Sequence, residues 1–108
     1  MNLPTEIFGE VIVVHTPEEL GSEQAGEFES FIATLERGNV VLDLDNTEML
    51  DSVGLTCLLE AQEKLRNEDG DIKIATTNAT NHKILEITRL DRQLEVFESV
   101  LDAVKSFQ

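Results

Sequence analysis

A serine stands between two regular patterns in this chain, and its hydroxyl could carry a phosphate. Residues 51–55 read Asp-Ser-Val-Gly-Leu; they follow an apolar run at 40–44 and precede an apolar stripe at helical spacing that continues to Leu65. The pattern predicts Ser52 at a strand-to-helix junction. Because the first turn of a helix has unpaired N–H groups and a positive partial charge, a phosphate on Ser52 would meet donors there. Ser52 could equally serve only as the N-cap of the helix, since serine and aspartate are common N-caps.

Polar residues of the preceding loop are expected beside this serine. Open α/β sheets bind ligands outside the C-terminal ends of their strands, and Asp45, Asn46 and Asp51 also follow the 40–44 run. Three explanations fit such an edge: a phosphorylation site with flanking recognition residues, a metal-binding phosphoaspartate site, and ordinary loop capping. A phosphoaspartate receiver needs an acidic pair after an early strand, whereas residues 15–17 are His-Thr-Pro. Asp45 and Asp51 offer too few ligands for a divalent ion, so no metal site is predicted.

The charge balance restricts the partners. The chain has 108 residues, with 22 acidic and 8 basic side chains and a net charge of -14. This charge argues against nucleic acid and against an anionic membrane surface, and it favours a basic or mixed-charge protein partner, although it could also serve solubility alone. No apolar run approaches the ~20 residues that span a bilayer, and the first residues lack a secretory pattern. A cytoplasmic protein without direct membrane insertion is therefore predicted.

No residue is predicted to act in catalysis. His15 and His82 are the only histidines, and neither lies in a metal-binding spacing or beside a recognisable nucleophile. The glycines do not form a phosphate-binding loop. Cys57 is the only cysteine and lies on the apolar stripe after Ser52, so it is expected to be buried. We therefore expect a non-enzymatic protein without a cofactor.

The order of the patterns predicts one α/β domain over residues 1–108, arranged as ββαβαβαβα. We expect a mixed, mainly parallel sheet of about five strands flanked by about four helices. The first two strands should form a hairpin, with Pro4 confining the first to the sheet edge. The first helix has two candidate starts, a capping box at 16–19 and the Gly-Ser pair at 21–22, and should end at Gly38. The β-type runs are 3–8, 11–15, 40–44, 72–76 and 94–97, and the later helices start near residues 52, 78–80 and 99.

These features together resemble a known family. The apolar run, the acidic loop, the Asp-Ser-x-Gly-Leu stretch and the amphipathic helix look like the signature of the STAS domain, specifically of bacterial anti-sigma factor antagonists. The resemblance covers nearly the whole chain and includes the Asp-Gly pair at 69–70 and the segment 94–104. Residues 18–20 are Glu-Glu-Leu where the family often has Gly-x-Leu, and Val53 stands where a second Ser or Thr is common. Ser52 is thus the single obvious phosphate acceptor.

The resemblance implies a mechanism of partner switching. The dephosphorylated domain would bind an anti-sigma factor that is also a serine protein kinase and so release the sigma factor. Phosphorylation of Ser52 would end the binding, and a serine phosphatase would reset the switch. The alternative is a non-switching STAS subunit or scaffold, for example of a lipid-transport ATPase complex, in which Ser52 is only a helix cap. The residues expected to bind the partner are Asp45, Asn46, Asp51, Ser52, Val53 and Gly54.

Overall fold

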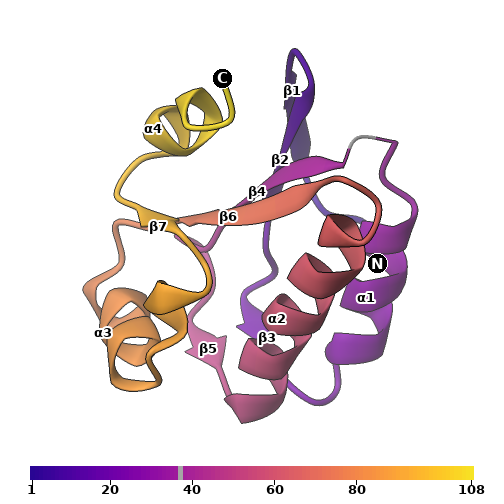
Figure 1. The fold of residues 1–108 in the computed structure, drawn as a ribbon. Helices are drawn as coiled ribbons and strands as arrows, with labels where there is room; N and C mark the ends of the chain where they lie inside the picture. The colour runs from indigo at the N-terminus through magenta and orange to yellow at the C-terminus, as the bar shows by residue number, and fades with distance from the viewer. Residues whose placement is uncertain (37) are drawn as a thin grey trace.

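A mixed β-sheet forms the centre of the computed structural model, which describes residues 1–36 and 38–108 (Figure 1). Five strands form this sheet in the order β1-β2-β4-β6-β7. β1 and β2 are antiparallel, and every other neighbouring pair is parallel. This confirms the predicted sheet, including the opening hairpin and its edge strand. The strands are β1 (Thr5–Phe8), β2 (Val11–His15), β4 (Asn39–Asp43), β6 (Asp71–Ala75) and β7 (Val96–Phe97).

The central strands are apolar on both faces because helices cover both faces of the sheet. Figure 1 shows α1, α2 and α3 on one side and α4 on the other. Alternate residues of β2 and β4 therefore enter two separate apolar clusters, one containing Val14 and Leu42 and the other Val13 and Val41. No helix in the described part of the chain is long and apolar enough to cross a bilayer. The α-helices are α1 (Ala25–Ala33), α2 (Ser52–Arg66), α3 (Ala79–Ile87) and α4 (Val100–Lys105), and η1 (Leu90–Arg92) is a 3-10 helix.

A buried lysine fastens α4 to its side of the sheet. The ammonium group of Lys73, on β6, donates to the hydroxyl of Ser106 at 2.8 Å and lies 4.4 Å from the ring centroid of Phe107. Ser99 caps α4 as the pattern predicted, its hydroxyl accepting from the backbone N–H of Asp102 at 3.0 Å. A cation over an aromatic ring is attracted by the ring's negative face, and Oε2 of Glu95 lies 3.7 Å from the same ammonium group, so the buried charge of Lys73 is compensated from both.

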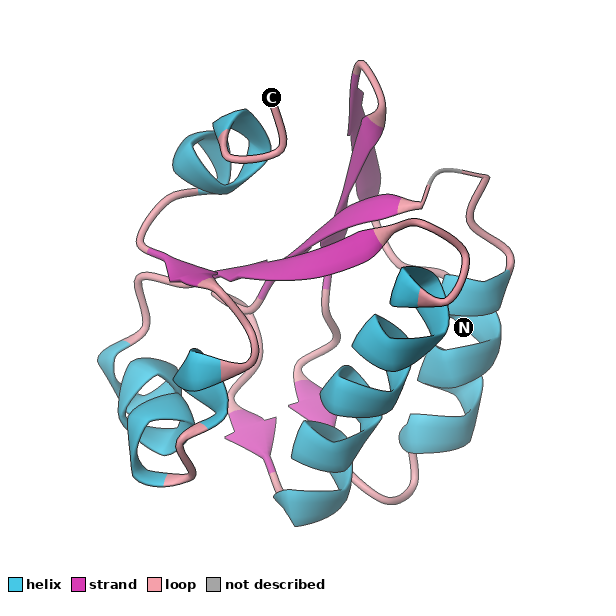
Figure 2. Cartoon of the chain, viewed as in Figure 1, coloured by secondary structure: helices cyan, strands magenta, loops and turns pink. Residues whose placement is uncertain are grey.

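Two short strands that the sequence did not predict precede the serine in the chain. β3 (Glu19–Leu20) and β5 (Met49–Leu50) pair in parallel, separate from the main sheet (Figure 2). The capping box proposed at 16–19 is therefore wrong: Thr16 is buried and these residues lead into β3. The first helix begins later, at Ala25.

The first helix also ends earlier than predicted, at Ala33 instead of Gly38. After Ala33 the backbone forms hydrogen bonds of the 3-10 type, between residues three apart. The N–H of Thr34 donates to the carbonyl of Phe31, and the N–H of Leu35 donates to the carbonyl of Ile32. The Thr34 hydroxyl donates to the same Phe31 carbonyl at 2.7 Å. Leu35 still packs on the core although it lies outside the helix. Apolar spacing therefore continued past the real helix end, because a tight turn can bury a residue as well as a further helical turn can.

Candidate functional site

The serine singled out in the sequence is the first residue of α2, and the residue before it caps the helix. Asp51 has an extended backbone, and its Oδ1 accepts from the N–H of Gly54 at 2.9 Å. Ser52 is exposed, and within residues 1–36 and 38–108 no hydrogen bond involves its hydroxyl. The prediction that Ser52 serves as the cap is therefore wrong. An aspartate at this position is favoured further by the positive end of the helix dipole.

Two glycines allow α2 to begin against β3. A Cβ on Gly54 would overlap the carbonyl oxygen of Leu20 and would lie 3.1 Å from a methyl group of Leu50. A Cβ on Gly21 would lie 2.6 Å from Oδ2 of Asp51. Gly54 is consequently buried, and its place in the sequence has a packing reason that is independent of any partner. The Asp-Ser-Val-Gly spacing thus combines a cap, an exposed hydroxyl and a close helix–strand contact.

The two loop carboxylates predicted to cluster bind different segments of the chain. Asp45 lies beyond the end of β4, where its Oδ1 accepts from the N–H of Thr77 at 2.6 Å and from the hydroxyl of Thr76 at 3.2 Å. Asp51 instead holds the first turn of α2, and β5 lies between the two in the chain. Asn46 is exposed in the connecting loop. In the described residues no three His, Cys, Asp or Glu side chains are placed to hold a metal ion.

A buried polar network supports the loop that leads to Ser52. The hydroxyl oxygens of Thr16 and Thr47 lie 2.5 Å apart, and they reach the carbonyl oxygens of Asp43 and Pro17 at 3.0 and 2.6 Å. The side-chain amide of Asn81, from α3, donates to the Leu44 carbonyl at 3.1 Å and to the Thr47 carbonyl at 2.9 Å. Sequence reasoning assigned Thr16 to a helix cap and missed the other two side chains, because polar loop residues look alike in a sequence whether they face water or a buried carbonyl.

A histidine, His15, lies at the end of β2 and contacts two carboxylates. Nδ1 of His15 is 2.9 Å from Oδ2 of Asp43, and Nε2 is 2.7 Å from Oε1 of Glu6. Both ring nitrogens face carboxylates, an arrangement that the doubly protonated imidazolium satisfies with two donated hydrogen bonds. Burial lowers the pKa of His15, but the hydrogen bond with Glu6 and the charge of Asp43 outweigh it and raise the pKa above its ordinary value. His15 therefore ties β1 to the end of β4.

The surface around the serine is partly apolar and partly acidic. Val53 is 42% exposed and Met49 is 38% exposed, so both contribute apolar surface close to Ser52 in the chain. Glu19, the partner of Met49 in the small sheet, and Glu48 are also exposed. We refer to Met49, Ser52 and Val53 as the Ser52 face. These three exposed residues combine two apolar side chains with a hydroxyl, and exposed carboxylates flank them in the chain.

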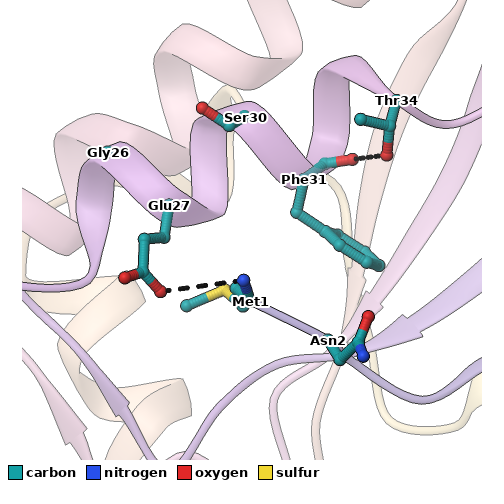
Figure 3. A pocket seen from close by; sticks show the side chains of 7 residues that line it. All are labelled: Met1, Asn2, Gly26, Glu27, Ser30, Phe31 and Thr34. Carbon is teal, nitrogen blue, oxygen red and sulfur yellow. Dashed lines mark hydrogen bonds and ion pairs between the residues drawn. The ribbon is translucent and has the colours of Figure 1, made fainter.

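A hollow of about 520 Å³ lies elsewhere, between the first residues of the chain and α1 (Figure 3). Glu27 and the Met1 amino group form an ion pair of 3.9 Å across it, and Ser30 lies on the same helix. Ser52 does not line this hollow, and its walls contain neither a histidine nor a cysteine. Ser30 and Thr34 contribute hydroxyl groups to its lining, but neither belongs to the sequence motif around Ser52, so the Ser52 face remains the candidate site.

The fold and the site define a small α/β domain with an exposed serine hydroxyl at the start of a helix. The family model described as the STAS domain matches residues 2–103, so the chain belongs to the STAS domain family. This membership confirms the resemblance seen in the sequence.

Known members show the kind of STAS domain that it resembles. A TM1081 homolog from Thermotoga neapolitana, provisionally named as an anti-sigma factor antagonist, is 24% identical over 109 residues, covering 97% of this chain and 96% of the relative. The crystal structure of an anti-sigma factor antagonist from Mycobacterium paratuberculosis is 26% identical with a TM-score of 0.84, covering 97% and 92% of the two chains. Phosphorylated SpoIIAA from Bacillus shares the fold, with a TM-score of 0.72 at 15% identity over 99% and 100% of the chains. The chain is thus a STAS domain similar to anti-sigma factor antagonists.

Proposed function

We propose that this domain is an anti-sigma factor antagonist that switches partners through phosphorylation of Ser52. The carrying observation is that Ser52 is exposed while Asp51 already caps α2. A kinase could therefore reach the hydroxyl, and adding a phosphoryl group would not remove the cap. The similarity to anti-sigma factor antagonists supports the proposal, as does the fold shared with SpoIIAA, which has been solved in a phosphorylated form.

In the dephosphorylated state the Ser52 face binds the anti-sigma factor. Met49 and Val53 lie within three residues of Ser52 in the chain and supply exposed apolar area, and such area is the main source of affinity in protein interfaces. The carboxylates of Asp51 and Glu48 complement basic groups of the partner, with Asp45 and Asn46 further along the same loop. Gly54 contributes through its backbone position, because it has no exposed side chain.

Phosphorylation reverses this match without refolding the domain. A phosphate adds about -1.5 to -2 charge at neutral pH, next to the carboxylate of Asp51. The free N–H groups of the first turn of α2 stabilise that charge within the domain, although Asp51 already occupies the N–H of Gly54. A partner packed against Met49 and Val53 would then enclose a strongly hydrated group. Desolvating that group against the partner is costly, so the complex dissociates.

The domain itself supplies a binding surface and a phosphate acceptor, and it is not an enzyme. The kinase activity belongs to the anti-sigma factor, and a separate serine phosphatase restores the hydroxyl. We expect the domain and both partners to act in the cytoplasm.

The test compares four proteins: wild type, Ser52→Ala, Ser52→Glu and Ser30→Glu. Ser30 is an exposed serine on α1, so Ser30→Glu adds the same charge on a different surface (Figure 3). Each protein captures partners from a lysate of the source bacterium, the anti-sigma factor is identified by mass spectrometry, and its Kd is then measured with purified components. Wild type, Ser52→Ala and Ser30→Glu should bind alike, while Ser52→Glu should lose at least about tenfold, or 1.4 kcal/mol.

Phosphate transfer provides the second readout. Incubation with the captured anti-sigma factor and ATP should add one phosphate to wild type and Ser30→Glu and none to Ser52→Ala. Equal affinity of all four proteins, with no phosphate on Ser52, would instead indicate a constitutive scaffold.

A further inference from the structure

A second exposed surface of the domain carries three basic side chains. Lys83 and Ile87 stand one helical turn apart on α3, and Arg89 and Arg92 bracket η1 directly after it. α3 and η1 are packed side by side (Figure 1). Ile87 is 70% exposed, more than any other large apolar side chain of the described chain, and the three basic side chains are exposed as well. We call these four residues the α3–η1 patch.

The three cations of the patch form no ion pair among the described residues, although acidic side chains greatly outnumber basic ones in the chain. The chain has 8 basic and 22 acidic side chains. Lys64, Arg66 and Lys73 each form an ion pair, whereas no ion pair within residues 1–36 and 38–108 involves a cation of the patch. With so many carboxylates in the chain, three exposed cations within ten residues that form no ion pair among the described residues leave positive charge available to another molecule.

The backbone of Arg89 gives an independent indication. It follows Thr88, the C-cap of α3, and its φ of 62° lies in the left-handed region that glycine normally occupies at this position. A non-glycine residue there is held in an unfavourable conformation, and such positions concentrate at functional sites. Arginine at Arg89 therefore places a charged side chain where folding alone favours glycine.

We propose that the α3–η1 patch docks an acidic protein segment that also carries an apolar side chain. The three cations would bind carboxylates, and Ile87 would contact the apolar side chain. Glu86 and Asp91 are interspersed among the cations, which suits the mixed pattern of a protein surface better than the uniform negative charge of a nucleic acid or a membrane. This interaction is separate from the Ser52 face and does not depend on phosphorylation.

The probe is a fluorescein-labelled peptide in which aspartates and glutamates flank a central leucine, and its binding is followed by fluorescence anisotropy. Wild type should bind it at low salt and release it at about 1 M salt, where the Debye length is about 3 Å. Arg89→Gly should weaken binding roughly 2- to 5-fold. Because glycine suits the backbone of this position, Arg89→Gly should melt at or above the wild-type temperature by circular dichroism, so weaker binding would not reflect unfolding.

Two variants separate the patch from bulk effects. Asp69 is the other non-glycine residue with a left-handed backbone, at φ 67°, so Asp69→Gly relieves the same kind of strain outside the patch. Ser52→Glu lowers the net charge by one, as Arg89→Gly does, but at the other surface. Asp69→Gly should bind the peptide at least as tightly as wild type. Ser52→Glu should bind it with a Kd within about twofold of the wild-type value.

Three results would overturn the proposal. The first is no peptide binding by wild type, and the second is equal weakening by Arg89→Gly and Ser52→Glu. The third is tighter binding of phosphatidylglycerol vesicles or of a single-stranded oligonucleotide than of the peptide. Failure here leaves the Ser52 proposal intact, because that proposal is tested by binding of the captured anti-sigma factor and by phosphate transfer to Ser52, and neither readout involves the acidic peptide.

Discussion

The neighbours Asp51 and Ser52 should respond very differently to replacement by alanine. Asp51 binds the Gly54 N–H at 2.9 Å, whereas the exposed Ser52 hydroxyl holds nothing in the described part of the chain. We therefore predict that Asp51→Ala destabilises the fold and that Ser52→Ala leaves its stability almost unchanged. Sequence patterns alone treat the two residues as equivalent candidates for the cap.

The size of each effect follows from the contacts. Loss of an N-cap side chain costs about 0.5–2 kcal/mol, and because Gly54 is buried, its N–H would be left without an acceptor, which favours the upper half of that range. Ser52→Ala should stay within about 0.5 kcal/mol of wild type. Asp51→Asn keeps an acceptor oxygen and loses only the charge at the helix N-terminus, which costs about 0.3–1 kcal/mol.

Urea unfolding followed by far-ultraviolet circular dichroism measures these differences. The chain has no Trp and no Tyr, so intrinsic fluorescence would report little. The unfolding free energy should be largest for wild type and Ser52→Ala, smaller for Asp51→Asn and smallest for Asp51→Ala. If Ser52→Ala were as destabilising as Asp51→Ala, the serine would have a structural role, and its assignment as a free phosphate acceptor would lose its basis.

Two further predictions concern the neighbouring packing and the pH dependence. Gly54→Ala forces a Cβ onto the Leu20 carbonyl and should cost about 1–3 kcal/mol in the same urea experiment; a neutral result would mean that α2 is not seated on β3. The ion pairs of His15 with Glu6 and Asp43 should stabilise the fold below the ordinary histidine pKa and lose this effect as the pH rises through the raised pKa of the folded state. His15→Gln should therefore destabilise more at about pH 6 than at about pH 9, and an equal loss at both pH values would contradict a charged His15.

Much of the fold was predictable because its signals are local. The continuous apolar runs at 11–14 and 40–44 predicted strands buried on both faces, and both are central in the sheet. The apolar stripe through Leu58 and Leu65 predicted α2, and Cys57 is buried as expected. The two-residue strands β3 and β5 were not predictable, since a single pair of residues has no periodicity and its pairing joins segments about 30 residues apart.

The sequence by itself determined the family, the five-stranded sheet and the candidacy of Ser52, because repeated apolar spacing and a short motif are local properties of the chain. Only the tertiary structure decided which residue caps α2 and why Gly54 is required. Both answers depend on β3 lying against the start of α2, and this contact joins segments that are distant in the sequence. Tertiary packing likewise gave Asp45 and Asp51 different partners, the loop after β6 for Asp45 and the first turn of α2 for Asp51. A polar side chain acquires its role from the partner that packing brings to it, and residue spacing does not record that partner.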